Sequence, residues 1–96
     1  MNEVPNKIIS LVKDHRVIFS GKARHQLDLG VFDTDDVIHS ILYGKVIKKE
    51  RDEQKVSEYK YTIIGPSRSG VSIYSCGKIV NLFERTYFII TFHETR

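Results

Sequence analysis

Residues 33–51, DTDDVIHSILYGKVIKKER, decide the fold class of this chain, because the spacing of their apolar side chains changes at Gly44. Before Gly44 the apolar residues recur at helical spacing and form one stripe. The stripe consists of Val37, Ile38, Ile41 and Leu42. The acidic run 33–36 supplies an N-cap and places negative charge in the first turn, where the helix dipole favours it. After Gly44, residues 45–51 alternate in part, as a strand does. The segment therefore predicts a helix followed directly by a strand.

Two shorter helices are predicted before this segment. Residues 5–14 begin at a proline, which suits a first helical turn, and carry apolar side chains at helical spacing. Residues 22–29 follow Ser20, a good N-cap, and end at Gly30, which can adopt the left-handed conformation that closes a helix. Between these helices, residues 17–19 form a brief β-like run.

Three further β-rich segments follow, at residues 59–64, 71–80 and 86–93. The sequence GPSRSG at 65–70 is a strong turn signal, and Cys76-Gly77 is a candidate β-bulge. Four strands with short loops predict an antiparallel meander, with helices over one face and the other face partly open. We therefore expect an α+β fold with two or three N-terminal helices packed on a four-stranded antiparallel sheet, as one domain over residues 1–96.

The last strand, residues 86–93, has a two-sided pattern that predicts which side chains share a face. One side is expected to carry Phe88, Ile90 and Phe92. The other side is expected to carry Tyr87, Ile89, Thr91 and His93.

Composition excludes several classes of protein. The chain has 96 residues, of which 41% are hydrophobic and 28% charged, which is ordinary for a globular domain. The single cysteine, Cys76, excludes an internal disulfide framework and a cysteine-rich zinc site. No stretch approaches the roughly 20 apolar residues that cross a bilayer, and the N-terminus does not have the pattern of a signal peptide. We therefore expect a cytoplasmic protein with no membrane partner.

The net charge of +3 is mild, but the charges are unevenly distributed. Acidic residues cluster between 28 and 36, whereas basic residues spread over 13–24, 45–60 and 68–85. A basic face would attract phosphates, and a mixed, solvated surface is the alternative.

The sequence has no motif for metal or nucleotide chemistry. It contains no phosphate-binding loop, no nucleophile elbow and no His-Glu-x-x-His zinc motif. His15, His25 and His39 lie on or beside different predicted helices, and the acidic cluster already has a structural role as a helix cap. We therefore expect neither a metal nor another cofactor.

The predicted sheet carries Lys, Arg, Tyr and His side chains, a set that can cut RNA without a metal. When the 2′-hydroxyl of RNA attacks the neighbouring phosphorus, a base must take its proton and an acid must protonate the leaving 5′-oxygen. Cations must stabilise the added negative charge. Tyrosines on strands also serve as packing residues, which is the alternative for each of them. The candidates are Lys48, Lys49, Arg51, Tyr59, Tyr61, Arg68, Tyr74, Lys78, Arg85 and His93.

Over residues 16–94 the order of signals resembles a small bacterial family of unnamed function, often encoded beside zinc-finger antitoxins of the YgiT type. The matching segments are Ser20-Gly21-Lys22-Ala23, Leu29-Gly30-Val31, the acid-capped helix 34–44, and Ile89-Ile90-Thr91-Phe92-His93. The chain departs from the family pattern at Lys22, where the family has a histidine, and the segment up to Gly30 is one residue short. If that histidine is catalytic in the family, this chain must use another group or be inactive.

A second resemblance is to the MqsR ribonuclease toxins, whose fold is like that of RelE. It is carried by Ala23, by Leu27-Asp28-Leu29-Gly30-Val31 and by the ending Phe92-His93-Glu94. The resemblance implies that His93 takes part in RNA cleavage, and that Lys48 (or Lys49) and Tyr74 occupy places comparable to a lysine and a tyrosine of the toxin. The active-site glutamine of those toxins has no clear counterpart here.

The first hypothesis is therefore an mRNA endonuclease toxin that acts on free or ribosome-bound mRNA and is neutralised by a cognate antitoxin. In it, Lys48 and Arg68 hold the phosphate, His93 is the acid or base, and Tyr74 orients or donates. The further RNA-binding or phosphate-binding candidates are Lys22, Arg24, Lys49, Arg51, Lys78 and Arg85.

Two other hypotheses stay open. One is a non-catalytic module that binds RNA or protein through the same face, which the lysine at position 22 favours. The other is an interaction protein, such as a phage or plasmid accessory factor, whose last strand pairs with the edge of a partner sheet.

Overall fold

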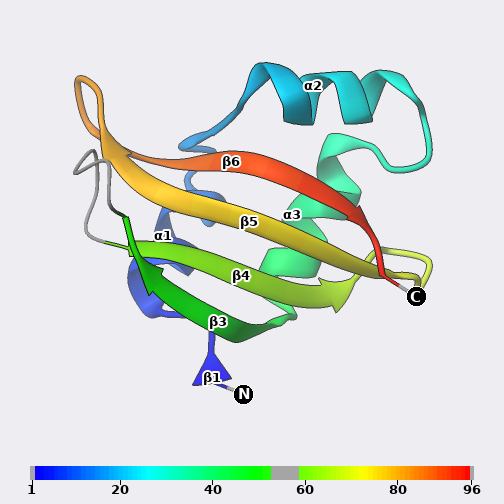
Figure 1. Cartoon of the computed structure of the whole chain (residues 1–96), viewed down its shortest axis with the longest axis horizontal. Helices are drawn as coiled ribbons and strands as arrows, with labels where there is room; N and C mark the ends of the chain where they lie inside the picture. The colour runs from blue at the N-terminus through cyan, green and yellow to red at the C-terminus, as the bar shows by residue number, and fades with distance from the viewer. Residues whose placement is uncertain (1, 53–58, 96) are drawn as a thin grey trace.

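Helices lie against one face of a twisted sheet in the computed structural model, which describes residues 2–52 and 59–95 (Figure 1). The helices of the described residues are α1 (Asn6–Lys13), α2 (Gly21–Asp28) and α3 (Thr34–Leu42). The strands are β1 (Asn2–Glu3), β2 (Val17–Phe19), β3 (Lys45–Arg51), β4 (Tyr59–Pro66), β5 (Ser72–Asn81) and β6 (Arg85–Glu94). The α+β class expected from the sequence is confirmed. None of these helices is long and apolar enough to span a membrane.

The signals that begin and end the helices act as the sequence predicts. Ser20 caps α2, since its hydroxyl oxygen accepts a hydrogen bond of 3.0 Å from the backbone N–H of Ala23. Gly30 follows the helix with φ of +81°, in the left-handed region. Asp33 and Asp36 form a reciprocal capping box at the start of α3.

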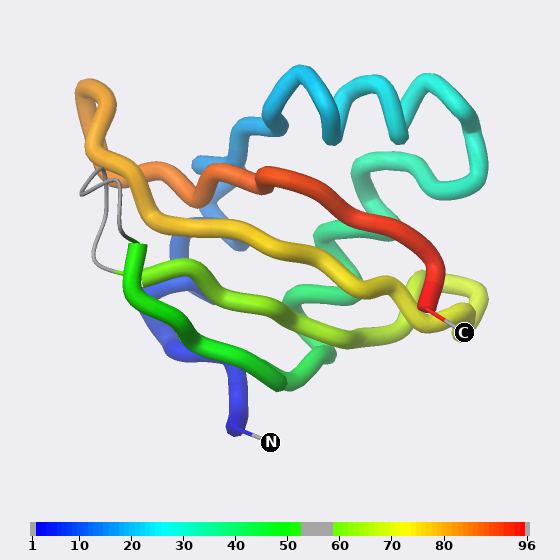
Figure 2. The backbone as a smooth tube through the Cα atoms, in the orientation of Figure 1, coloured from blue at the N-terminus to red at the C-terminus, as the bar shows by residue number. Residues whose placement is uncertain are grey.

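The sheet has six strands in the described residues, in the order β1-β3-β4-β5-β6-β2 (Figure 2). Strands β3 to β6 form the predicted antiparallel meander, but β2 pairs with β6 in parallel and β1 pairs with β3. The expectation of a purely antiparallel four-stranded sheet is therefore wrong. The two added strands contain two and three residues, too few to show an alternating pattern, and a parallel partner so far along the chain leaves no local signal.

The hydrophobic core fills the space between the helices and the sheet. Fully buried side chains come from the helices and from every second position of the central strands. They include Ile8, Val12, Val37 and Ile41 from the helices, and Ile63, Ile73, Tyr87, Ile89 and Phe92 from the sheet. The sheet therefore has one apolar side beneath the helices, and its other side carries the remaining alternate residues.

A β-bulge interrupts the pairing of β5 with β6. It lies on β6, across from Cys76-Gly77, where the sequence predicted a bulge. Cys76 pairs with Thr91 and Gly77 pairs with Ile89, so Ile90 is the inserted residue. The irregularity therefore lies beside Cys76-Gly77, as predicted, but the extra residue belongs to β6.

The bulge reverses the alternation of β6 and corrects the predicted faces. Phe92 is buried beneath the helices together with Tyr87 and Ile89, and not on the side of Phe88. His93 lies on the side opposite Tyr87 and is exposed. An inserted residue shifts the period-two pattern by one step, so every side chain after it changes face.

Candidate functional site

The face of the sheet opposite the helices carries three rows of side chains, which cross-strand pairing defines. The first row is Glu50, Lys60, Lys78 and Phe88. The second row is Lys48, Thr62, Cys76 and Thr91. The third row is Lys45, Ile64, Tyr74 and His93. No helix of the described residues lies over these rows (Figure 1). We call this surface the open face.

Tyr74 and His93 are cross-strand neighbours on the open face, and their rings stack. The ring centroids lie 4.7 Å apart and the ring planes differ by 16°. Tyr74 is half-buried and His93 is exposed. Stacking of this kind stabilises an aromatic pair by roughly 0.5–1.5 kcal/mol, so it limits the positions that the imidazole samples. The sheet thus presents a proton carrier at a defined place.

One nitrogen of His93 is committed to the backbone. Its Nδ1 lies 3.0 Å from the carbonyl oxygen of Glu94. Because a carbonyl oxygen only accepts hydrogen bonds, Nδ1 is the donor in this contact. In the neutral imidazole the other nitrogen, Nε2, is then the one that can accept a proton. Nε2 of His93 is therefore the atom suited to act as a general base.

Lys48 shares the open face with the stack but does not touch it. It lies on β3, two strand spacings across from Cys76, and its backbone is therefore about 12 Å from that of Tyr74, two residues further along β5. Its Nζ is 3.7 Å from Oε2 of Glu50, and both side chains are largely exposed. Such a surface pair is weak, so the ammonium group can exchange this partner for a phosphate.

The second row, to which Lys48 belongs, also contains the only cysteine, Cys76. Burial raises the pKa of the Cys76 thiol, and the charge of Lys60 and a hydrogen bond with Thr62 oppose this only in part. The thiol is therefore protonated at neutral pH and is a poor nucleophile. The surface over Cys76 is available to a ligand that touches the stack on one side and lysine ammonium groups on the other.

Lys78 is engaged in an ion pair that is mostly buried. Its Nζ lies 3.2 Å from Oδ2 of Asp52, and the two side chains are 12% and 3% exposed. A pair so far removed from water holds its geometry but offers little charge to a phosphate. Lys78 thus shapes the open face more than it contributes positive charge.

Arg68 is directed to the helical side of the molecule. It lies in the turn between β4 and β5, and its guanidinium contacts the carboxylates at the start of α3. The distances are 2.6 Å to Asp33, 3.1 Å to Asp36 and 3.9 Å to Asp35. Its charge therefore stabilises the acidic helix start, and the structure does not bring it to the stack.

The ion pair with Arg68 changes the titration of Asp36. Burial raises the pKa of this carboxyl, but hydrogen bonds from the Arg68 side chain and from the backbone N–H groups of Asp33 and Arg68 outweigh it. The pKa of Asp36 lies below its ordinary value as a result. The ionised form of Asp36 therefore stabilises the folded state more than the protonated form does.

Two further basic candidates, Lys49 and Arg51, alternate with Lys48 and Glu50 on β3. Lys49 Nζ lies 4.2 Å from the ring centroid of Tyr59 and 5.8 Å from that of Tyr61, on the helical side. Tyr61 is buried in the core, so for this tyrosine the packing role is confirmed. Arg51 lies at the end of the strand, at the rim of the open face.

The remaining basic candidates lie elsewhere. Lys22 and Arg24 are exposed on α2, in the helical layer. Arg85 begins β6 at the opposite end of the strand from His93. Of the three residues expected to form the catalytic group, the structure places Tyr74 and His93 in contact and Lys48 on the same face.

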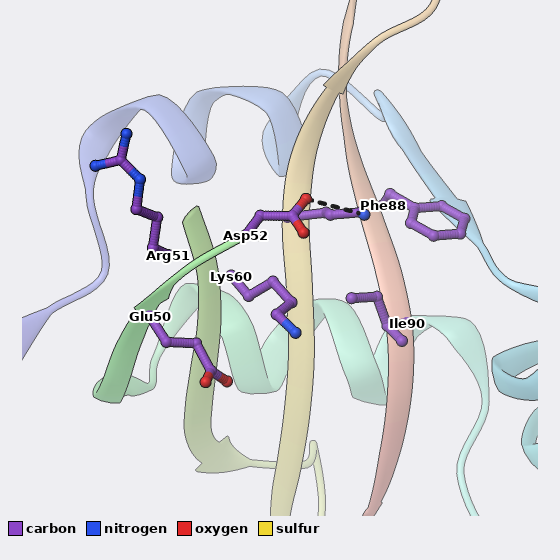
Figure 3. A pocket seen from close by; sticks show the side chains of 7 residues that line it. Glu50, Arg51, Asp52, Lys60, Phe88 and Ile90 are labelled. Atoms are coloured by element: carbon purple, nitrogen blue, oxygen red, sulfur yellow. Dashed lines mark hydrogen bonds and ion pairs between the residues drawn. The ribbon is translucent and has the colours of Figure 1, made fainter. Parts of the chain in front are cut away.

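Sequence reasoning missed several residues that shape the open face. They are Glu50, Asp52, Lys60 and Phe88, which line a depression beside the second row together with Arg51, Lys78 and Ile90 (Figure 3). The position of Lys60 could have been predicted from the sequence, because side chains alternate along a strand. Lys60 therefore lies on the same face as Thr62 and on the face opposite Tyr61. For Phe88 the signal was misleading, because the bulge changes which residues share its face. No cluster of three or more metal-ligating side chains occurs within 2–52 and 59–95.

Comparison with known proteins gives no relative: no family model, curated protein or solved structure matches this chain.

Proposed function

We propose that this chain is a metal-independent endoribonuclease of the toxin class, which cleaves mRNA and is neutralised by a cognate antitoxin. The observation that carries the proposal is the stack of Tyr74 and His93 on the open face, with Nε2 of His93 as the proton acceptor. The resemblance of residues 16–94 to a family encoded beside antitoxins supports the toxin class.

In the proposed reaction, Nε2 of His93 takes the proton of the 2′-hydroxyl while the 2′-oxygen forms its bond to phosphorus. The bond from phosphorus to the 5′-oxygen breaks, and the hydroxyl of Tyr74 gives its proton to that oxygen. The products are a 2′,3′-cyclic phosphate and a 5′-hydroxyl. Water returns a proton to Tyr74, and His93 releases its proton to solvent, so the site is restored.

The scissile phosphate is proposed to sit over Cys76 and Thr91, between the stack and Lys48. From there the flexible side chain of Lys48 reaches the phosphate oxygens by leaving Glu50, a partner only 3.7 Å away at an exposed position. The ammonium group then stabilises the charge that develops on the phosphorane oxygens. Arg68 has no part in this arrangement, because three carboxylates already surround its guanidinium.

A non-catalytic RNA-binding module is the second candidate. It is favoured by Lys22, which stands on the exposed surface of α2 where the family pattern has a histidine. In that case the open face holds RNA without cutting it.

Induced expression in bacteria tests the proposal. Wild type is expected to arrest growth and to shorten cellular mRNA, whereas His93→Ala and Tyr74→Phe are expected to do neither at equal protein levels. Because His93 is exposed, its replacement should leave the fold intact, which circular dichroism of the purified variants checks. Growth arrest that persists in both variants would remove the stack from the mechanism.

A further inference from the structure

The depression on the open face lies one row beyond the proposed cleavage position, and its lining is unlike that of a phosphate site. Its volume is about 480 Å³. Residues from all four strands of the meander line it, with charged groups from β3 and β4 and the side chains of Phe88 and Ile90 from β6 (Figure 3). Two carboxylates and three basic groups line it, and the apolar side chains beside them distinguish it from a simple phosphate site.

The floor of the depression is held by the ion pair of Lys78 and Asp52. With side chains only 12% and 3% exposed, these two residues keep a fixed arrangement and their charges compensate each other. Arg51 lies at the rim of the depression. Among the described residues, Glu50 is engaged only in its weak, exposed pair with Lys48. The polar groups available to a ligand inside the depression are the carboxylate of Glu50 and the ammonium group of Lys60. These residues are direct cross-strand partners, and their side chains extend over the same region (Figure 3).

The apolar side of the depression comes from Phe88 and Ile90, which are both half-buried. Apolar side chains at one edge of a depression, with a donor and an acceptor at the other edge, fit a flat heteroaromatic ligand with a polar edge. Proteins that read single-stranded RNA hold its bases in this way, against apolar or aromatic side chains and with hydrogen bonds to the base edge.

We propose that this depression is a guanine-binding subsite. The Watson–Crick edge of guanine offers two adjacent N–H donors at N1 and N2 to the carboxylate of Glu50, and its O6 accepts from the ammonium group of Lys60. Adenine presents an acceptor at N1 and cytosine presents an acceptor at N3, each of which meets the carboxylate unfavourably. Uracil has one N–H donor where guanine has two.

This inference rests on the proposed function in one respect, namely that the guanine belongs to the RNA substrate. Lys78 in the depression and Tyr74 in the stack are four residues apart on β5, or about 13 Å at the rise of a strand. The proposed phosphate position over Cys76 lies between them, about 7 Å from Lys78, so the guanine belongs to a nucleotide that adjoins the cleaved linkage. Its binding sets the position of cleavage relative to a guanine.

Fluorescence anisotropy tests the subsite with labelled 2′-O-methyl oligouridine, which has no free 2′-hydroxyl for cleavage and carries one guanosine, one adenosine or no purine at its centre. The guanosine oligonucleotide is expected to bind about tenfold more tightly than the adenosine one, as a good base-edge contact provides. Glu50→Gln and Lys60→Met should reduce this ratio to near one. Glu3→Gln and Lys7→Met are matched controls on exposed positions of β1 and α1, and they should keep the ratio. Competition by guanosine monophosphate distinguishes a site for the free nucleotide from one that needs a strand.

A guanosine-to-adenosine ratio near one in wild type, or an unchanged ratio in Glu50→Gln, would overturn the subsite. Cleavage of the corresponding unmodified oligonucleotides, measured in chelator, separates this result from the proposed function. Cleavage without guanine preference retains the nuclease and rejects the subsite. Guanine-dependent binding without cleavage retains the subsite and rejects the nuclease.

Discussion

The imidazole of His93 lies flat against the phenol ring of Tyr74, with centroids 4.7 Å apart, because a β-bulge at Ile90 brings His93 to the open face. Without that inserted residue, His93 would point to the side of Tyr87 and the helices. The contact thus links a local irregularity of β6 to the proposed chemistry of the sheet.

Substitutions of His93 and Tyr74 should reduce RNA cleavage and leave the fold intact. His93→Ala removes the proposed base, and we expect RNA cleavage to fall about 100-fold or more. Tyr74→Phe keeps the stack and loses only the hydroxyl, and we expect a loss of similar size. Single-turnover cleavage of a labelled oligonucleotide measures both. The rings of Tyr43 and His39 are in contact in the helical layer, with centroids 4.6 Å apart and planes tilted by 37°, so Tyr43→Phe is a matched control that should cleave as wild type does. A normal rate for Tyr74→Phe would exclude its hydroxyl as the acid.

Asp52→Ala should destabilise the fold more than removal of a surface ion pair. It leaves the Lys78 ammonium, in a side chain only 12% exposed, without the carboxylate 3.2 Å away. Uncompensated charge at a partly buried site costs roughly 2–3 kcal/mol, somewhat less than the loss of a partner in a fully buried pair. Glu50→Ala breaks the exposed pair with Lys48 and is expected to cost less than about 1 kcal/mol. Urea unfolding of both variants gives the comparison, and equal losses would show that the pair with Lys78 is no stronger than a surface pair.

Gly77 cannot accept a side chain without displacing Tyr87. A Cβ atom at Gly77 would lie 2.5 Å from Cζ of the buried Tyr87 ring. We expect Gly77→Ala to lower the free energy of unfolding by roughly 1–3 kcal/mol, as overpacking of a core does. Gly21→Ala is the matched control, since a Cβ there meets nothing within 4 Å at the start of α2. It should leave stability unchanged or raise it slightly, and an equal loss in both variants would contradict the close approach.

The hydroxyl of Tyr87 is buried and has no hydrogen-bond partner in the described part of the chain. Burial is the main cause that raises the pKa of this phenol above its ordinary value, so the hydroxyl is neutral at physiological pH. Tyr87→Phe removes a desolvated polar atom and keeps the ring, so we expect unchanged or increased stability. A thermal melt tests this, and a marked loss would reveal a partner for the hydroxyl.

The ion pairs of Arg68 with Asp33 and Asp36 at the start of α3 should make the stability of the protein depend on pH in the acid range. The pKa of Asp36 is lowered in the folded protein from its ordinary 3.8, so the ionised carboxyl contributes stability fully above that value. This contribution is lost as the pH falls through the lower, folded-state pKa. Arg68→Ala should therefore melt at a lower temperature than wild type at pH 7, and the difference should disappear in strong acid and shrink in high salt. A difference that is constant with pH would assign the effect of Arg68 to packing alone.

Long periodic segments made most of the fold predictable. The stripe of Val37 and Ile41 and the Asp33 cap located α3, and the change of period after Gly44 located β3 at its observed bounds. The parallel pairing of β2 with β6 was not predictable in this way. The pairing depends on where the packing of the helices places Val17–Phe19 relative to β6, and a segment of three residues has no pattern that predicts its partner strand.

The candidate site was predictable only in part. The chemistry of Tyr74 and His93 was readable from residue type, but the inserted Ile90 that brings them onto one face leaves no composition signal. Charged residues carry even less information in the sequence, since their partners decide their role. The sequence indicated that Arg68 and Lys78 bind phosphate. In the structure Arg68 contacts Asp33 and Asp36, and Lys78 pairs with Asp52, all of which lie far away in the sequence.

Analysis of RNA ends tests the central claim most directly. Purified protein is incubated with a defined single-stranded RNA in excess chelator, and both ends of each product are identified by mass. The account predicts fragments with 2′,3′-cyclic phosphate and 5′-hydroxyl ends from wild type, and intact RNA from His93→Ala. Intact RNA from wild type, or the same fragments at the same rate from His93→Ala, would contradict it.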